Sequence, residues 1–139
     1  MQIIGFHFTK INAEKLDSTK DTIINTHIDF TDLDKDKMEL FKDQDILQVL
    51  FNYSITYTPK EDKKATPPGS IALSGKVIIS ADKEESKEVF KFWKKKELPP
   101  SFQVPVYNLI LRKCSLKAAN LQEDIDLPLT LPLPKVQPA

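Results

Sequence analysis

The chain has 139 residues, of which 40% are hydrophobic and 29% charged, with 20 lysines and arginines balancing 20 aspartates and glutamates. This length predicts one domain over residues 1–139, and the zero net charge argues against binding to nucleic acid or to a charged membrane surface. The single cysteine excludes an internal disulfide, and no apolar run approaches the roughly 20 residues of a membrane span, so we expect a cytoplasmic protein.

The first two segments alternate between apolar and polar residues, the period of a β-strand. Strands are expected over Gln2–Asn12 and Thr22–Asp32, with a polar connection between them. Residues 32–45 are rich in aspartate and lysine. We expect them to form a loop or a single helical turn.

The clearest strand is Leu47–Tyr57, in which every odd position is apolar and most even positions are polar. Ser70–Ala81 repeats this alternation. Residues 59–69 between them contain several prolines, lysines and acidic residues, which is typical of a long hairpin tip. The two strands are therefore expected to pair antiparallel.

The period changes to that of a helix after residue 81. Asp82 followed by Glu85 is a capping-box pattern, which predicts a helix over Asp82–Leu98 that ends at Pro99–Pro100. A second helix is expected over Val104–Glu123, with Pro105 near its first turn. Four strands followed by two helices indicate an α+β fold, a four-stranded antiparallel sheet with both C-terminal helices on one face.

The last segment, residues 127–139, is rich in proline and leucine. Its prolines forbid a helix and a central strand, but they allow an extended chain. Four leucines lie two residues apart between Leu127 and Leu133. We expect this extended segment to dock on the body of the protein or on a partner chain.

Residues suited to catalysis or metal binding are few. His7 and His27 lie on the polar sides of their strands and would meet only if those strands were neighbours; with Asp29 alone nearby, they make a poor zinc site. Cys114 lies on the apolar side of a predicted helix and is expected to be a buried structural thiol. The sequence therefore predicts no enzyme, no cofactor and no metal, and an enzyme that uses the two histidines is the least favoured alternative.

Lys94–Lys96 follow Trp93, and aromatic residues beside basic ones can form a platform for single-stranded nucleic acid. Glutamates on the same helix offset this charge. We therefore favour a solvated helix face and expect no nucleic-acid partner.

Several apolar residues fall outside the faces assigned above: Ile3, Ile23, Phe41, Leu50, Ile78 and Phe102. They indicate either a second apolar surface or strand faces that shift by one residue at bulges, and both explanations stay open. The candidate surface for contact with a client polypeptide or with other copies of the chain consists of Phe51, Tyr53, Tyr57, Phe92, Trp93, Phe102, Leu129 and Leu131.

The order of these elements resembles the SecB protein-export chaperones and their SecB-like relatives. Phe6–Ile11 is similar to the opening strand of that family, and Leu47–Tyr57 with Ile71–Ala81 resembles its central hairpin. Pro105–Arg112 is similar in place to the long helix of the family, and Leu127–Val136 to the extended segment that follows it. The helix Asp82–Leu98 is an insertion relative to this pattern. Phe102–Tyr107 is only faintly similar to the family's proline- and aromatic-rich run before the long helix.

The resemblance implies an ATP-independent chaperone or adaptor that is a homo-oligomer, tetramer or dimer, and binds unfolded or extended polypeptide in apolar grooves. It implies no cofactor and no catalytic residue. The zero net charge departs from the acidic character of the export chaperone, so the resemblance is not extended to its partner ATPase. The alternative is a non-catalytic structural or regulatory subunit whose apolar surface binds only copies of itself.

Overall fold

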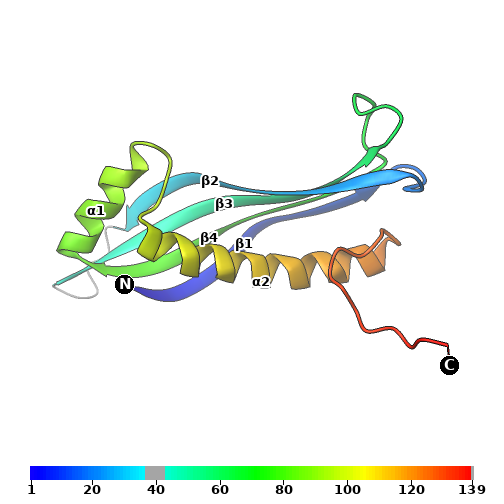
Figure 1. Ribbon diagram of the computed structural model, residues 1–139. Helices are drawn as coiled ribbons and strands as arrows, with labels where there is room; N and C mark the ends of the chain where they lie inside the picture. The colour runs from blue at the N-terminus through cyan, green and yellow to red at the C-terminus, as the bar shows by residue number, and fades with distance from the viewer. Residues whose placement is uncertain (37–42, 139) are drawn as a thin grey trace.

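The computed structural model describes residues 1–36 and 43–138 and consists of one antiparallel sheet with two helices (Figure 1). The four strands lie in the order β1-β4-β3-β2. Side chains from both helices enter the core on one face of the sheet, here called the inner face. The predicted α+β fold is confirmed. In chain order the elements are β1 (Gln2–Lys15), β2 (Thr22–Asp36), β3 (Gln44–Pro59), β4 (Gly69–Asp82), α1 (Lys83–Trp93) and α2 (Pro100–Asp124).

The strand order is that of a Greek key, because β2, β3 and β4 follow one another while β1 returns to lie beside β4. Residues 16–21 connect β1 with β2 across the end of the two central strands. This crossover is fastened to the base of the β3–β4 hairpin, where Leu16 N donates to Pro68 O at 2.8 Å and Lys60 N donates to Asp21 O at 3.1 Å. Because the order is β1-β4-β3-β2, strands β1 and β2 form the two edges of the sheet.

The core lies between the inner face and α2. Odd-numbered residues of β3 and β4 point inward, and those from Leu47 to Tyr57 are at most 3% exposed. This confirms the two central strands and their pairing, which joins Phe51 to Gly75 and Tyr57 to Gly69. The hairpin tip rises on the side of the sheet away from α2 (Figure 1).

The second strand is longer than expected, and this corrects the prediction of a loop or helical turn from residue 32. A β-bulge between Phe30 and Asp32 shifts the alternation by one residue. Leu33 therefore turns inward and is 6% exposed, while Asp32 and Asp34 face outward. The strand continues to Asp36, and residues 37–42 of the predicted segment lie outside the described part of the chain.

Helix α1 begins as predicted but ends early. Asp82 caps it, with the Glu85 N–H donating to the Asp82 side chain at 2.7 Å, and Glu85 completes the capping box. The helix ends at Trp93 rather than at Leu98. Lys96 adopts a left-handed backbone (φ 60°), which breaks the helix and turns the following chain so that Leu98 is buried.

Helix α2 begins four residues before the predicted start. Pro99 is its N-cap and Pro100 its first residue, because a proline needs no hydrogen-bond partner for its nitrogen at this position. The proline pair thus starts the second helix, and Pro105 lies inside it. The buried residues of α2 recur every fourth position: Phe102, Val106, Ile110, Cys114, Ala118 and Gln122. Since 3.6 residues make one turn, this line winds around the helix as it crosses the sheet.

The surplus apolar residues divide between the two explanations left open by the sequence. Ile3 precedes a bulge in β1 and packs against the core, and Phe102 is buried in it. Leu50 and Ile78 instead occupy outward positions and are half-buried, and Ile23 is 38% exposed. Phe41 lies outside the described residues.

Candidate functional site

The structure places half of the predicted apolar surface in the core. Phe51, Tyr53, Tyr57 and Phe102 are at most 3% exposed. The expectation that they form a contact surface therefore needs correction at these four positions. The physical reason is the length of α2, whose 25 residues run along most of the inner face of the sheet, while α1 lies at one end of the sheet (Figure 1). Phe92, Trp93, Leu129 and Leu131 are half-buried.

The aromatic residues of α1 do not form an exposed row. Trp93 packs against the core, and the Lys96 ammonium lies 5.1 Å from the centre of its ring, a cation–π contact. Phe92, the preceding residue of α1, is also half-buried. This arrangement supports the reading of Lys94–Lys96 as a solvated helix end.

A buried carboxylate fixes α1 to the sheet. Asp45 is 5% exposed and accepts a hydrogen bond from Lys83 Nζ at 2.5 Å, while Lys35 Nζ lies 3.4 Å away. The bond from Lys83 is the largest cause that lowers the pKa of Asp45, and Ser86 and Lys35 add to it. Asp45 thus joins the ends of β2, β3 and α1 electrostatically, which is a structural role.

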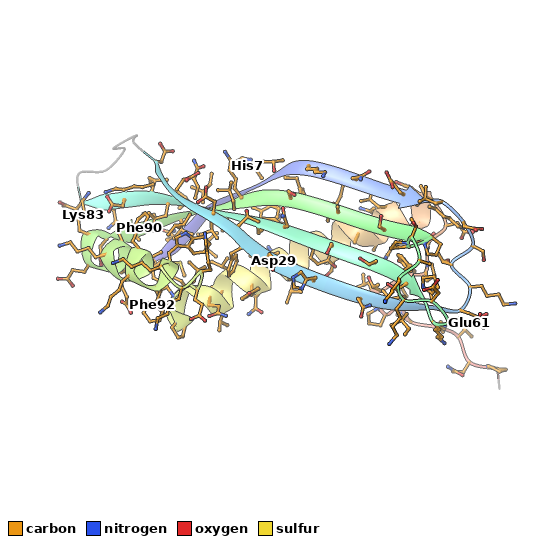
Figure 2. The ribbon with its side chains drawn as sticks, turned by 90° about the horizontal axis from the view of Figure 1, so that it is seen from above. His7, Asp29, Glu61, Lys83, Phe90 and Phe92 are labelled. Carbon is orange, nitrogen blue, oxygen red and sulfur yellow. The ribbon has the colours of Figure 1, made fainter. Side chains whose placement is uncertain are left out.

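The two histidines cannot act together. His7 lies on β1 and His27 on β2, at opposite edges of the sheet; Figure 2 shows His7 and Asp29 at these two edges. His27 Nε2 lies 2.9 Å from Asp29 Oδ1, and both side chains are exposed. Among residues 1–36 and 43–138, no three His, Cys, Asp or Glu side chains are grouped so that they could hold a metal ion.

Cys114 is fully buried in the α2 line. Burial raises the pKa of its thiol from 9.0 to about 12, so at pH 8 only about one thiol in ten thousand is the reactive thiolate. Because the folded state favours the neutral thiol, the contribution of Cys114 to the stability of the folded state is complete below about pH 9. This contribution is lost as the pH rises from about 9 towards 12.

We expect no reaction of the folded protein with a thiol reagent such as dithionitrobenzoate within an hour at pH 8. In 8 M urea, one thiol per chain should react within minutes. Absorbance at 412 nm measures both rates. Rapid reaction of the folded protein would contradict the packing of α2 on the sheet.

The outer edge of β1 has the properties of a surface that binds an extended chain. Within residues 1–36 and 43–138, its backbone is paired with β4 on one side and with no strand on the other, which leaves a row of N–H and C=O groups without a strand partner there. Residues 2–8 carry no Asp, Glu, Lys or Arg. Phe6 and Phe8 lie half-buried on the inner side of this edge, with ring centres 5.0 Å apart in an edge-to-face arrangement. Ile4 and Ile11 nearby are 49% and 48% exposed.

The opposite edge, β2, differs in charge. Its second half presents Asp29, Asp32, Asp34 and Asp36 along the outward face, and charged residues on an edge oppose pairing with another strand. Its first half, residues 22–28, is uncharged apart from His27 and includes Ile23 and Ile24 at 38% and 37% exposure. The β1 edge is the stronger candidate because it combines open backbone with an aromatic pair.

A second site holds the C-terminal segment against the body. Gln122 is fully buried and donates through Nε2 to Tyr57 Oη at 2.9 Å. Tyr57 Oη in turn donates to the carbonyl oxygen of Pro128 at 2.5 Å, and Gln122 Oε1 accepts from Thr130 N at 3.3 Å. Leu127 is 5% exposed. Of the two alternatives expected for this segment, the body or a partner chain, docking on the body is observed for residues 127–131, while residues 132–138 are exposed.

Of these surfaces, the first part of β1 combines an edge position, half-buried aromatic side chains and an absence of charged residues over residues 2–8. The sequence did not reveal which strands are edges, since strand order depends on long-range pairing. It also missed Gln122, although the spacing of four from Phe102 through Ala118 extends to this residue and could have identified it.

None of the helices in the described part of the chain is both long and apolar enough to cross a membrane. No protein-family model matches the sequence, and no curated protein is similar enough to serve as a relative.

Proposed function

We propose that this protein is an ATP-independent chaperone or adaptor that binds unfolded or extended polypeptide, with the β1 edge as its main binding surface. A bound segment would add a strand beside β1 and place apolar side chains on Phe6 and Phe8. Backbone hydrogen bonds give such a complex affinity with little dependence on sequence. The proposal agrees with the SecB-like order of elements in the sequence.

The observation that carries the proposal is the uncharged, unpaired stretch of β1 beside the Phe6–Phe8 pair. Proteins commonly protect a long edge with charged residues, as this chain does along the second half of β2. Residues 2–8 lack such charged residues. Pairing of another chain with this part of the edge would explain why they are absent.

The second candidate is a structural or regulatory subunit in which the same edge pairs with a second copy of the chain. The outward apolar residues Leu50 and Ile78 and the exposed Val104, Leu111 and Leu116 of α2 also favour self-association. A homo-oligomer, dimer or tetramer, is compatible with both candidates. They differ in whether an edge stays open to other polypeptides.

The test is the aggregation of insulin after reduction of its disulfides, followed by light scattering with and without this protein. We expect an equimolar amount of its oligomer to reduce the scattering at least about twofold without ATP. Ile4→Lys should abolish most of this effect, because it puts a charge into the uncharged stretch of the edge.

The matched control is Val136→Lys, which adds the same charge at a position 99% exposed and should leave the effect unchanged. Size-exclusion chromatography with light scattering gives the oligomeric state of each variant. A stable oligomer that leaves insulin aggregation unaffected would refute the chaperone proposal and favour the structural subunit.

A further inference from the structure

The C-terminal segment is held mainly through its backbone. Pro128 contributes its carbonyl oxygen and Thr130 its N–H, each bonded to a buried side chain of the body. Tyr57 and Gln122 thus hold two main-chain groups of the segment that belong to residues two apart in sequence.

Side chains of the segment contribute at few positions. Leu127 enters a space beside Gly69, where an added Cβ would lie only 2.7 Å from Leu127 Cδ2. Gln122 Nε2 also donates to Thr130 Oγ1 at 3.2 Å. Leu129 and Leu131 remain half-buried. The contacts thus consist mainly of one buried apolar side chain, Leu127, followed by two main-chain hydrogen bonds at Pro128 and Thr130. We call Tyr57, Gly69 and Gln122 the tail site.

We propose that the tail site is a binding site for leucine- and proline-containing peptide segments, and that residues 127–131 of the chain itself occupy it in competition with such segments from other proteins. This site is separate from the β1 edge and does not depend on the function proposed for that edge.

Competition follows from the connection between the segment and the body. Residue 127 lies three residues beyond the end of α2, so its effective concentration at the site is on the order of millimolar or higher. A peptide from outside binds only to the fraction of molecules whose site is vacant, which weakens its apparent affinity in proportion. Substitutions in the segment that remove its contacts, but leave the tail site unchanged, increase the fraction of vacant sites. They therefore raise the apparent affinity for the outside peptide.

The probe is a fluorescein-labelled peptide with the sequence of residues 126–134, followed by fluorescence anisotropy. We expect weak binding to the unchanged protein and at least about tenfold tighter binding to the full-length variant Leu127→Ala/Thr130→Ala, in which the segment is weakened and the tail site is complete. If circular dichroism shows the double variant to be unfolded, Thr130→Ala alone should tighten binding at least about threefold.

Two controls give the test its specificity. Adding Tyr57→Phe to the weakened variant removes the donor to the peptide carbonyl and should reduce affinity at least about threefold, whereas Leu133→Ala, at a position 56% exposed, should change nothing. Equal binding to the unchanged and weakened proteins, no binding to either at 1 mM peptide, or indifference to Tyr57→Phe would each overturn the proposal. Adding Ile4→Lys should leave peptide binding unaltered, so the outcome for the tail site is independent of that for the β1 edge.

Discussion

Gly75→Ala is expected to destabilise the protein by about 3 kcal/mol or more. A Cβ at this position would overlap the carbonyl oxygen of His7 on the neighbouring β1, and it would lie 2.9 Å from the ring of Phe51. The first obstacle is backbone and cannot move without breaking the pairing of Phe8 with Gly75. The free energy of unfolding in urea, at one protein concentration, measures the effect.

Gly5→Ala is the matched control for this substitution. Gly5 is also in the sheet, but the three atoms nearest to a Cβ there all belong to the side chain of Ile78, at 3.3 Å or more. The side chain can shift by the few tenths of an ångström required, so we expect a change within about 1 kcal/mol. Similar losses for both variants would contradict the described register of β1 on β4.

Phe51→Ala should cost about 3–5 kcal/mol, since Phe51 is 1% exposed and its ring lies 5.5 Å from that of Phe6. The cavity would open in the centre of the core beneath α2. The control is Phe90→Ala on α1, where the side chain is 36% exposed and no closed cavity forms; its expected loss is about 1 kcal/mol.

This pair of variants also decides the role of Phe51, which the sequence assigned to a contact surface. A loss for Phe51→Ala no larger than that for Phe90→Ala would mean that Phe51 is accessible, as the sequence suggested. Urea unfolding measures stability, and circular dichroism of both variants shows whether the fold is retained.

The elements of the fold were predictable because their signals are local. Alternation marked both central strands, and the Asp82–Glu85 box marked the start of α1. Features that depend on distant partners were not predictable from one sequence. The bulge at Phe30–Asp32 moved the end of β2, and the Pro99–Pro100 pair, expected to end one helix, begins the next.

The candidate site was predicted less well than the fold, for a related reason. Large aromatic residues such as Tyr53 and Tyr57 are common both in cores and on binding surfaces, so their exposure depends on what covers them. The early start and full length of α2 decide that question here. The uncharged stretch of β1 is visible in the sequence, but its importance depends on β1 being an edge, which only the strand order reveals.

The return of β1 to the far side of β4 has a consequence for the order in which the chain folds. Strands β2, β3 and β4 each pair with the strand that follows or precedes them in sequence. By contrast, β1 pairs with the last strand, so that Gln2 lies opposite Ser80. Loop closure over such a separation carries an entropic cost that nearby pairings avoid. We therefore expect the three-stranded meander of β2, β3 and β4 to form first and β1 to be added last. During synthesis the first strand leaves the ribosome earliest and must wait for its partner, β4, to follow. In that interval β1, the edge strand that we propose binds other polypeptides, is itself without its partner strand.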